Sequence, residues 1–169
     1  MCIIIDTNTL SSVFKNDDAQ HHVFEPVKRW IMEGKGKVVY GGSKYISELG
    51  PNYVRLFSLL RGAGKAVFVP NDIVDSDMNV VSAQITHDNF DDQHIVALLR
   101  VSGCKLICSS DRRAYPFFRH NLFFNPARNK PKIYSSLGNT SLLVDRNIAD
   151  VCLPCSPTTN AQRVVIGTV

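Results

Sequence analysis

The chain has 169 residues, enough to bury the core of one domain and too few for two ordinary ones. Its 44% hydrophobic and 20% charged residues are typical of a soluble globular protein, and no apolar stretch approaches the roughly 20 residues of a membrane span. We therefore expect a cytoplasmic protein with no membrane segment. The net charge of +4 is compatible with a polyanionic partner, but on its own it indicates only a solvated surface.

Short apolar runs alternate with amphipathic segments through the first 111 residues. The runs predict strands at 2–5, 38–40, 66–69 and 104–108. The amphipathic segments predict helices at 7–14, at 53–60 and from about 91 to Gly103. Three more predicted helices begin at a capping residue: one runs from Asp17 or Asp18 to about residue 31, one from Ser43 to 48, and one from Asp72 to about 87. This alternation indicates an α/β fold, a parallel sheet with helices on both faces.

The pattern is weaker after residue 120. We expect a basic loop at 125–132, a last strand at 142–144, a loop at 154–160 and an apolar end at 164–166. We interpret residues 1–169 as one domain in which 120–169 form a C-terminal extension whose structure the pattern does not specify.

The five cysteines indicate a reducing compartment rather than a disulfide framework, because their number is odd and three lie in predicted strands. Cys152 and Cys155 have the spacing of half a structural zinc site, but no second pair completes four ligands. We expect an exposed turn there.

Two acidic residues follow predicted buried strands. Asp6 ends the run Cys2–Ile5, and Asp111 follows the strand at 104–108. The carboxyl ends of parallel strands are where open α/β folds place their chemistry, so both side chains are candidates for an active site. The alternative for each is a helix N-cap.

Two further acids lie on predicted helices. Glu48 ends one helix, and Asp92 shares a helical face with inward-facing Ile95 and Val96, which favours Asp92 for the site and Asp91 for solvent. Two carboxylates about 4 Å apart repel by roughly 4 kcal/mol at an effective dielectric near 20. Four converging carboxylates therefore predict a bound Mg²⁺ or Mn²⁺, or raised pKa values without one.

Polar neighbours suit supporting roles. Asn8 and Ser109 each lie two positions from a strand-end aspartate and are candidates to orient a carboxylate or a water. Arg112 and Arg113 are candidates to bind substrate phosphate, although paired surface arginines are common. The five histidines show no metal-binding spacing, and we interpret them as structural or surface residues.

The segments 3–8, 47–49, 92–98 and 109–111 together resemble, in order and spacing, the PIN-domain nucleases. The resemblance covers residues 2 to about 118, with Ser109 where threonine is more usual. It implies a Rossmann-like three-layer α/β/α sandwich with metal ligands at Asp6, Glu48, Asp92 and Asp111 and polar helpers at Asn8 and Ser109. It also implies an endoribonuclease dependent on Mg²⁺ or Mn²⁺, in many relatives the toxin of a toxin-antitoxin pair, with an antitoxin partner and a homodimer.

Two alternatives stay open, and a third lacks the residues that it requires. One is a non-catalytic PIN-like domain that binds RNA or a protein partner. Another is a phosphatase of the haloacid dehalogenase type, which begins with a similar strand but needs a second aspartate where this chain has Asn8. A phosphoacceptor receiver domain would need an adjacent acidic pair and a strand-end lysine, and neither is present.

Overall fold

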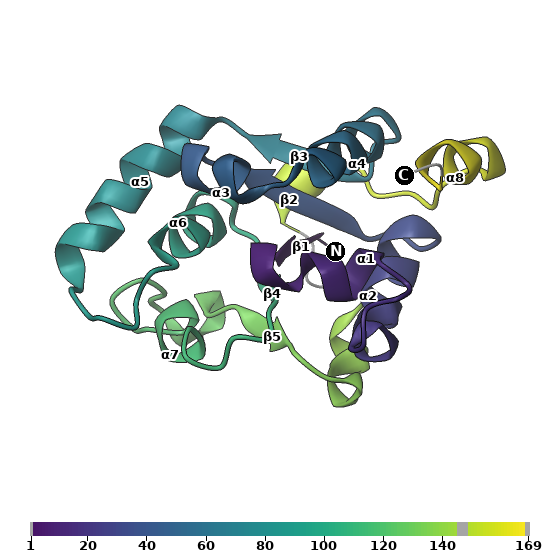
Figure 1. The fold of residues 1–169 in the computed structure, drawn as a ribbon. Helices are drawn as coiled ribbons and strands as arrows, with labels where there is room; N and C mark the ends of the chain where they lie inside the picture. Colours follow the sequence, from purple (N-terminus) through teal and green to yellow (C-terminus); the bar gives the residue numbers. More distant parts are fainter. Residues whose placement is uncertain (1, 145–148, 168–169) are drawn as a thin grey trace.

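The computed structural model describes residues 2–144 and 149–167 of the chain. These residues form a five-stranded sheet, all of it parallel, with helices flanking it (Figure 1). The predicted α/β class, a Rossmann-like three-layer arrangement with a parallel central sheet, is confirmed.

The strands follow the order β3-β2-β1-β4-β5 across the sheet. Their bounds are β1 Cys2–Ile5, β2 Lys37–Gly41, β3 Ala66–Val69, β4 Leu106–Cys108 and β5 Lys132–Tyr134. The chain first builds the sheet away from β1 on one side, then returns to add β4 and β5 on the other. The order therefore reverses between β1 and β4, and in such sheets ligands bind at the carboxyl ends of the two strands beside the reversal.

Eight α-helices are described along the chain. They are α1 Leu10–Phe14, α2 His21–Met32, α3 Ser43–Glu48, α4 Pro51–Gly62, α5 Asn71–Gln84, α6 Gln93–Ser102, α7 Tyr115–Phe118 and α8 Asn160–Ile166. Helix α1 packs against α2, and α5 packs against α6. Connections between parallel strands are right-handed. Because the strand order reverses between β1 and β4, the helices that precede the reversal therefore cover one face of the sheet, and those that follow it cover the other.

The central strands are apolar throughout because both faces of the sheet are covered. Every residue of β1 and β4 is buried, and α6 buries seven of its ten residues, with Ile95 to Leu99 continuous among them. Burying apolar surface contributes roughly 25 cal/mol per Å², so this core is the main source of stability. It fixes the strand ends that carry the candidate acids.

Several predicted boundaries are wrong in detail. The predicted helix at 7–14 is a 3₁₀ turn, Thr7–Thr9, followed by α1. Asp17 and Asp18 do not cap α2, which begins after Gln20, and the caps predicted at Ser43 and Asp72 fall at Gly42 and Pro70. In each case the cap or the helix start lies within one to three residues of the expected position, and helix ends are the part of an element that a local pattern specifies least.

The C-terminal predictions contain larger errors. The basic loop at 125–132 holds a 3₁₀ turn, Ala127–Asn129, and ends inside β5, which the sequence pattern did not predict. The strand predicted at 142–144 is wrong, because a 3₁₀ helix spans Leu137–Leu142 there. The apolar end at 164–166 belongs to α8. Within the described ranges, no helix has the length and apolarity that crossing a bilayer requires.

Candidate functional site

Asp6 lies at the reversal point of the sheet, immediately after β1. Its backbone N–H donates to the Cys108 carbonyl at 2.9 Å, and only 1% of the residue is exposed. Its Oδ1 accepts the Asn8 backbone N–H at 3.0 Å, and its Oδ2 accepts the Ser109 hydroxyl at 2.7 Å. Burial raises the Asp6 pKa, the two hydrogen bonds oppose the rise, and the charges of Asp111 and Glu48 add to it.

The loops that follow β1 and β4 are tied together by hydroxyl groups. Besides its bond to Asp6, the Ser109 Oγ accepts the Asp111 backbone N–H at 3.1 Å. Thr9 Oγ1 accepts the Ser110 backbone N–H at 3.2 Å. Ser109 thus links the two strand-end aspartates through one hydroxyl.

A glycine turn and two anchors bring helix α3 to the same edge. Gly42 has φ +88°, and a Cβ there would lie 2.6 Å from Val74 Cγ1, so only glycine fits without strain. The next residue, Ser43, donates from its backbone N–H to Asp75 Oδ1 at 2.8 Å. The buried Tyr45 hydroxyl donates to the Ile5 carbonyl at 2.7 Å, which fixes α3 against the last residue of β1.

Glu48, at the end of α3, is surrounded by donors. Its Oε2 accepts the Thr7 hydroxyl at 2.7 Å, and its Oε1 lies 3.1 Å from Lys44 Nζ. Burial acts to raise the Glu48 pKa, but the Thr7 hydrogen bond and the positive charges of His94 and Lys44 outweigh it and leave the pKa lowered. Glu48 is therefore ionised at neutral pH.

His94 lies beside Glu48 at the site, whereas the expectation for it was a structural or surface histidine. It is 2% exposed, and its Nε2 is 3.3 Å from Glu48 Oε2. Neither ring nitrogen has a hydrogen-bond partner among the described residues. Burial lowers its pKa, and the nearby Glu48 charge only partly offsets this. A signal was present in its position, because His94 shares the first turn of α6 with the apolar residues that point inward.

Asp92 precedes the first residue of α6 and is half-buried, whereas Asp91 is exposed, as expected. Burial and then the charges of Asp6, Asp91, Asp111 and Glu48 raise the Asp92 pKa to about 7. Among the described residues, none donates a hydrogen bond to its carboxylate. Asp92 is thus a carboxyl group under repulsion from the other three predicted acids, without compensation of its own.

Asp111 is held by its neighbour Arg113. Its Oδ1 accepts the Arg113 backbone N–H at 2.9 Å and Nε at 3.1 Å, and its Oδ2 accepts an Arg113 terminal nitrogen at 2.8 Å. The Arg113 hydrogen bonds lower the Asp111 pKa against the effect of partial burial. Arg112, predicted with Arg113 to bind phosphate, is exposed, and neither a hydrogen bond nor an ion pair joins it to the four acids in the described residues.

The four predicted acids gather at one edge of the sheet, close enough that each of the other three raises the Asp92 pKa. Beside them is a cavity of about 340 Å³ lined by polar side chains from three segments, Thr7, Asn8, Lys44, Glu48, Asp91 and Asp92. Asp6 and Asp111 are not in its lining. In residues 2–144 and 149–167, no three acidic, histidine or cysteine side chains already surround a common point as metal ligands would.

The donor set nevertheless fits a hard divalent cation. Mg²⁺ and Mn²⁺ prefer carboxylate oxygens. Two of the four carboxyl groups, Asp6 and Asp92, have raised pKa values, and a bound cation would lower them by stabilising the ionised carboxylates. The buried His94 nitrogens, which lack a hydrogen bond although Nε2 lies 3.3 Å from Glu48 Oε2, are a second sign of a missing partner. Positive charge is supplied to Glu48 by Lys44 and to Asp111 by Arg113.

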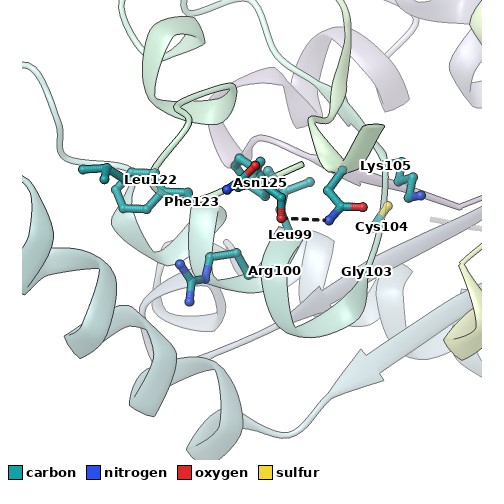
Figure 2. A pocket seen from close by; sticks show the side chains of 10 residues that line it. Leu99, Arg100, Gly103, Cys104, Lys105, Leu122, Phe123 and Asn125 are labelled. Atoms are coloured by element: carbon teal, nitrogen blue, oxygen red, sulfur yellow. Dashed lines mark hydrogen bonds between the residues drawn. The ribbon is translucent and has the colours of Figure 1, made fainter. Parts of the chain in front are cut away.

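A larger cavity, of about 500 Å³, lies at the opposite end of α6 and contains no acid. Figure 2 shows its lining, where Arg100 points away from the hydrogen-bonded pair formed by Asn129 Nδ2 and the Asn125 carbonyl, 3.2 Å apart. Arg100 forms an ion pair with Asp77, in which Nε and Oδ2 are 2.9 Å apart. Because this cavity borders residues that precede β4, it lies at the amino edge of the sheet, away from the strand-end chemistry.

The prediction of an exposed turn at the CxxC sequence is wrong for Cys152. This residue is fully buried against the amino edge of the sheet, where it contacts Cys2, while Cys155 is half-buried. All five cysteines are free thiols. Burial of Cys152 reflects tertiary packing of the C-terminal segment, which the local sequence does not encode.

No protein-family model, curated protein or solved structure matches the chain. The resemblance to PIN-domain nucleases therefore rests on the residues and on their placement in the fold.

Proposed function

We propose that the protein is an endoribonuclease of the PIN type that depends on Mg²⁺ or Mn²⁺. The observation that supports this best is the convergence of Asp6, Glu48, Asp92 and Asp111 at the point where the strand order reverses. There burial, and then the charges of the neighbouring acids, raise the Asp92 pKa to about 7. Nothing in an apo fold is gained by gathering four acids, whereas a divalent cation would be stabilised by them.

Asp6, Asp92 and Asp111 would hold the cation, and Glu48 would complete its surroundings. A bound divalent ion polarises a phosphoryl group and lowers the pKa of water, which is the chemistry that phosphodiester hydrolysis needs. Ser109 orients the Asp6 carboxylate through its hydroxyl, 2.7 Å from Oδ2.

The chain itself supplies an acceptor for the attacking water and positive charge. Glu48 stays ionised through Thr7 and Lys44, so its carboxylate oxygens can accept hydrogen bonds from an attacking water and position it. The buried His94 ring limits the directions in which Glu48 can turn. Lys44, whose side chain is 53% exposed, lines the cavity and can contact a substrate phosphate.

Choice of RNA as the substrate comes from the family resemblance. The positive net charge supports it, because four of the 15 acidic residues are withdrawn into the site and leave the remaining surface more basic. By the same resemblance we propose that the protein acts as a toxin, is inhibited by an antitoxin partner and forms a homodimer.

Incubation of the protein with total RNA and Mn²⁺, with and without EDTA, tests the proposal. We expect cleavage that EDTA abolishes and that Asp6→Asn removes, while the variant unfolds at the same or a higher temperature because a buried charge is gone. Asp72→Asn, an exposed acid in the first turn of α5, is the control and should retain activity. Full activity in Asp6→Asn would contradict the assignment, and cation binding without any cleavage would favour the non-catalytic alternative.

A further inference from the structure

Arg113 binds Asp111 in the way that a cation would. Three of its donors, the backbone N–H, Nε and a terminal nitrogen, contact the two carboxylate oxygens at 2.8–3.1 Å. The charges of Asp91 and Asp92 also act on the Arg113 guanidinium and, after Asp111, help to raise its pKa. One side chain therefore supplies positive charge to Asp111, as Lys44 does to Glu48.

This ion pair is easily exchanged. The Arg113 side chain is 71% exposed and that of Asp111 is 21% exposed, and ion pairs this open to water add little stability. If the guanidinium leaves, the Arg113 backbone N–H still donates to Asp111 Oδ1 at 2.9 Å, so the turn keeps its shape. The side chain can thus move without unfolding anything.

We propose that Arg113 is an internal counter-ion that occupies the place of the divalent cation at Asp111 and, when the cation binds, passes its guanidinium to a backbone phosphate of the substrate strand. This inference rests on the proposed function. Guanidinium suits the transfer because its planar fork binds carboxylate and phosphate with the same geometry.

The exchange couples the two ligands. Without cation, Asp111 competes with phosphate for Arg113, and without substrate, Arg113 competes with the cation for Asp111. Cation and RNA should therefore strengthen each other's binding, and by linkage the two effects must be equal in size. A surface arginine that only adds positive charge would weaken cation binding and would show no such coupling.

Calorimetric titration with Mn²⁺ alone tests the first half. Arg113→Gln should bind Mn²⁺ about threefold or more tightly than the wild type, since a partly exposed ion pair is removed from competition. Arg112→Gln is the matched control, because it loses the same charge one residue away without contacting the acids. Its Mn²⁺ affinity should change by less than about twofold, since screening weakens distant charges.

Binding of fluorescein-labelled oligouridylate, followed by anisotropy in EDTA and in Ca²⁺, tests the second half, with the RNA checked for intactness on a gel. Ca²⁺ accepts the same oxygen ligands. It should increase the affinity of the wild type for RNA and increase that of Arg113→Gln much less, with Arg113→Lys between them. Equal Mn²⁺ affinity in wild type and Arg113→Gln, or equal coupling in both, would overturn the role of Arg113. No Mn²⁺ binding by the wild type would instead overturn the proposed function.

Discussion

The Asp92 carboxyl group is the residue in which repulsion within the site is most evident. Its pKa is about 7 in the folded chain, because of burial and the neighbouring charges, against an ordinary 3.8. Between about pH 4 and pH 7, the Asp92 carboxyl group is therefore protonated in the folded state and ionised in the unfolded state. By linkage, the free energy of unfolding falls as the pH rises through this window, and the destabilisation is complete above pH 7.

Replacing this acid should remove that dependence. Asp92→Asn should unfold roughly 2–6 °C higher than the wild type at pH 8 and at nearly the same temperature at pH 4, a range that allows for solvent screening of a half-buried group. Thermal unfolding monitored by circular dichroism at the two pH values measures this. Asp91→Asn, its exposed neighbour, should retain most of the wild-type pH dependence, and an unchanged profile in Asp92→Asn would refute the environment described for Asp92.

His94 is a second residue whose replacement separates stability from activity. Its two buried, unpartnered nitrogens destabilise the fold, since each lacks the hydrogen bond that water would give it. His94→Leu should leave the free energy of unfolding unchanged or raise it by up to about 1 kcal/mol, while cleavage falls about tenfold or more because Glu48 is no longer held in place. Denaturant unfolding and cleavage rates measure the two effects. A less stable but fully active His94→Leu would assign His94 to the core alone.

At the scale of elements, the site depends on the tie between the loops that follow β1 and β4. Ser109 is fully buried and bonds to both the Asp6 side chain and the Asp111 backbone. Ser109→Ala should lower the free energy of unfolding by about 1–3 kcal/mol and reduce cleavage, because the Asp6 pKa would rise further. Ser110→Ala, at an exposed position, should change stability by no more than about 0.5 kcal/mol. Similar effects of the two changes would show that Ser109 does not position the acid.

Strands buried on both faces could be predicted, because a short continuous apolar run such as Cys2–Ile5 is typical of a strand in the centre of a parallel sheet. The edge strand β5 could not. Only one of its three residues is fully buried, and Lys132 is exposed, so its local pattern does not differ from that of a loop.

The same division holds for the candidate site. Asp6 and Asp111 could be proposed because each follows an apolar run, Asp92 because it shares a helical face with inward-facing apolar residues, and Glu48 because of the family resemblance. The position of His94 on the apolar face of α6 indicates its burial. Its contact with Glu48 and the pairing of Arg113 with Asp111 depend on tertiary packing and on side-chain rotamers, and neither contact leaves a periodic signal.

For the whole molecule, the C-terminal segment closes the edge of the sheet opposite the acids. Lys65 is 1% exposed, and its Nζ donates to the Gly34 carbonyl at 2.8 Å and the Ser156 carbonyl at 3.1 Å. Thr158 donates to the Met32 carbonyl, and Gln162 Nε2 donates to that of Ala63 at 3.3 Å. These contacts attach residues 156–162 to the turns beside α2 and α4, so this part of the extension has a structural role.

Lys65→Met tests that separation of roles. Losing the two hydrogen bonds that the buried Lys65 ammonium donates to the Gly34 and Ser156 carbonyls should lower the free energy of unfolding by about 1–3 kcal/mol. Cleavage per folded molecule should be unchanged, because the substitution lies at the far edge of the sheet. Denaturant unfolding measures the first effect, and single-turnover cleavage at low temperature the second. A cleavage defect at a temperature where the variant is folded would connect the two edges.

Cation binding by the four carboxylates is the claim on which the rest depends, and the electron paramagnetic resonance signal of free Mn²⁺ measures it without substrate. We predict that the wild type binds Mn²⁺, that Asp92→Asn binds it about tenfold or more weakly, and that Asp91→Asn stays within about twofold of the wild type, because Asp92 is half-buried near the other three acids whereas Asp91 is exposed to water. Absence of binding by the wild type at millimolar Mn²⁺, or equal binding by Asp92→Asn, would contradict the account.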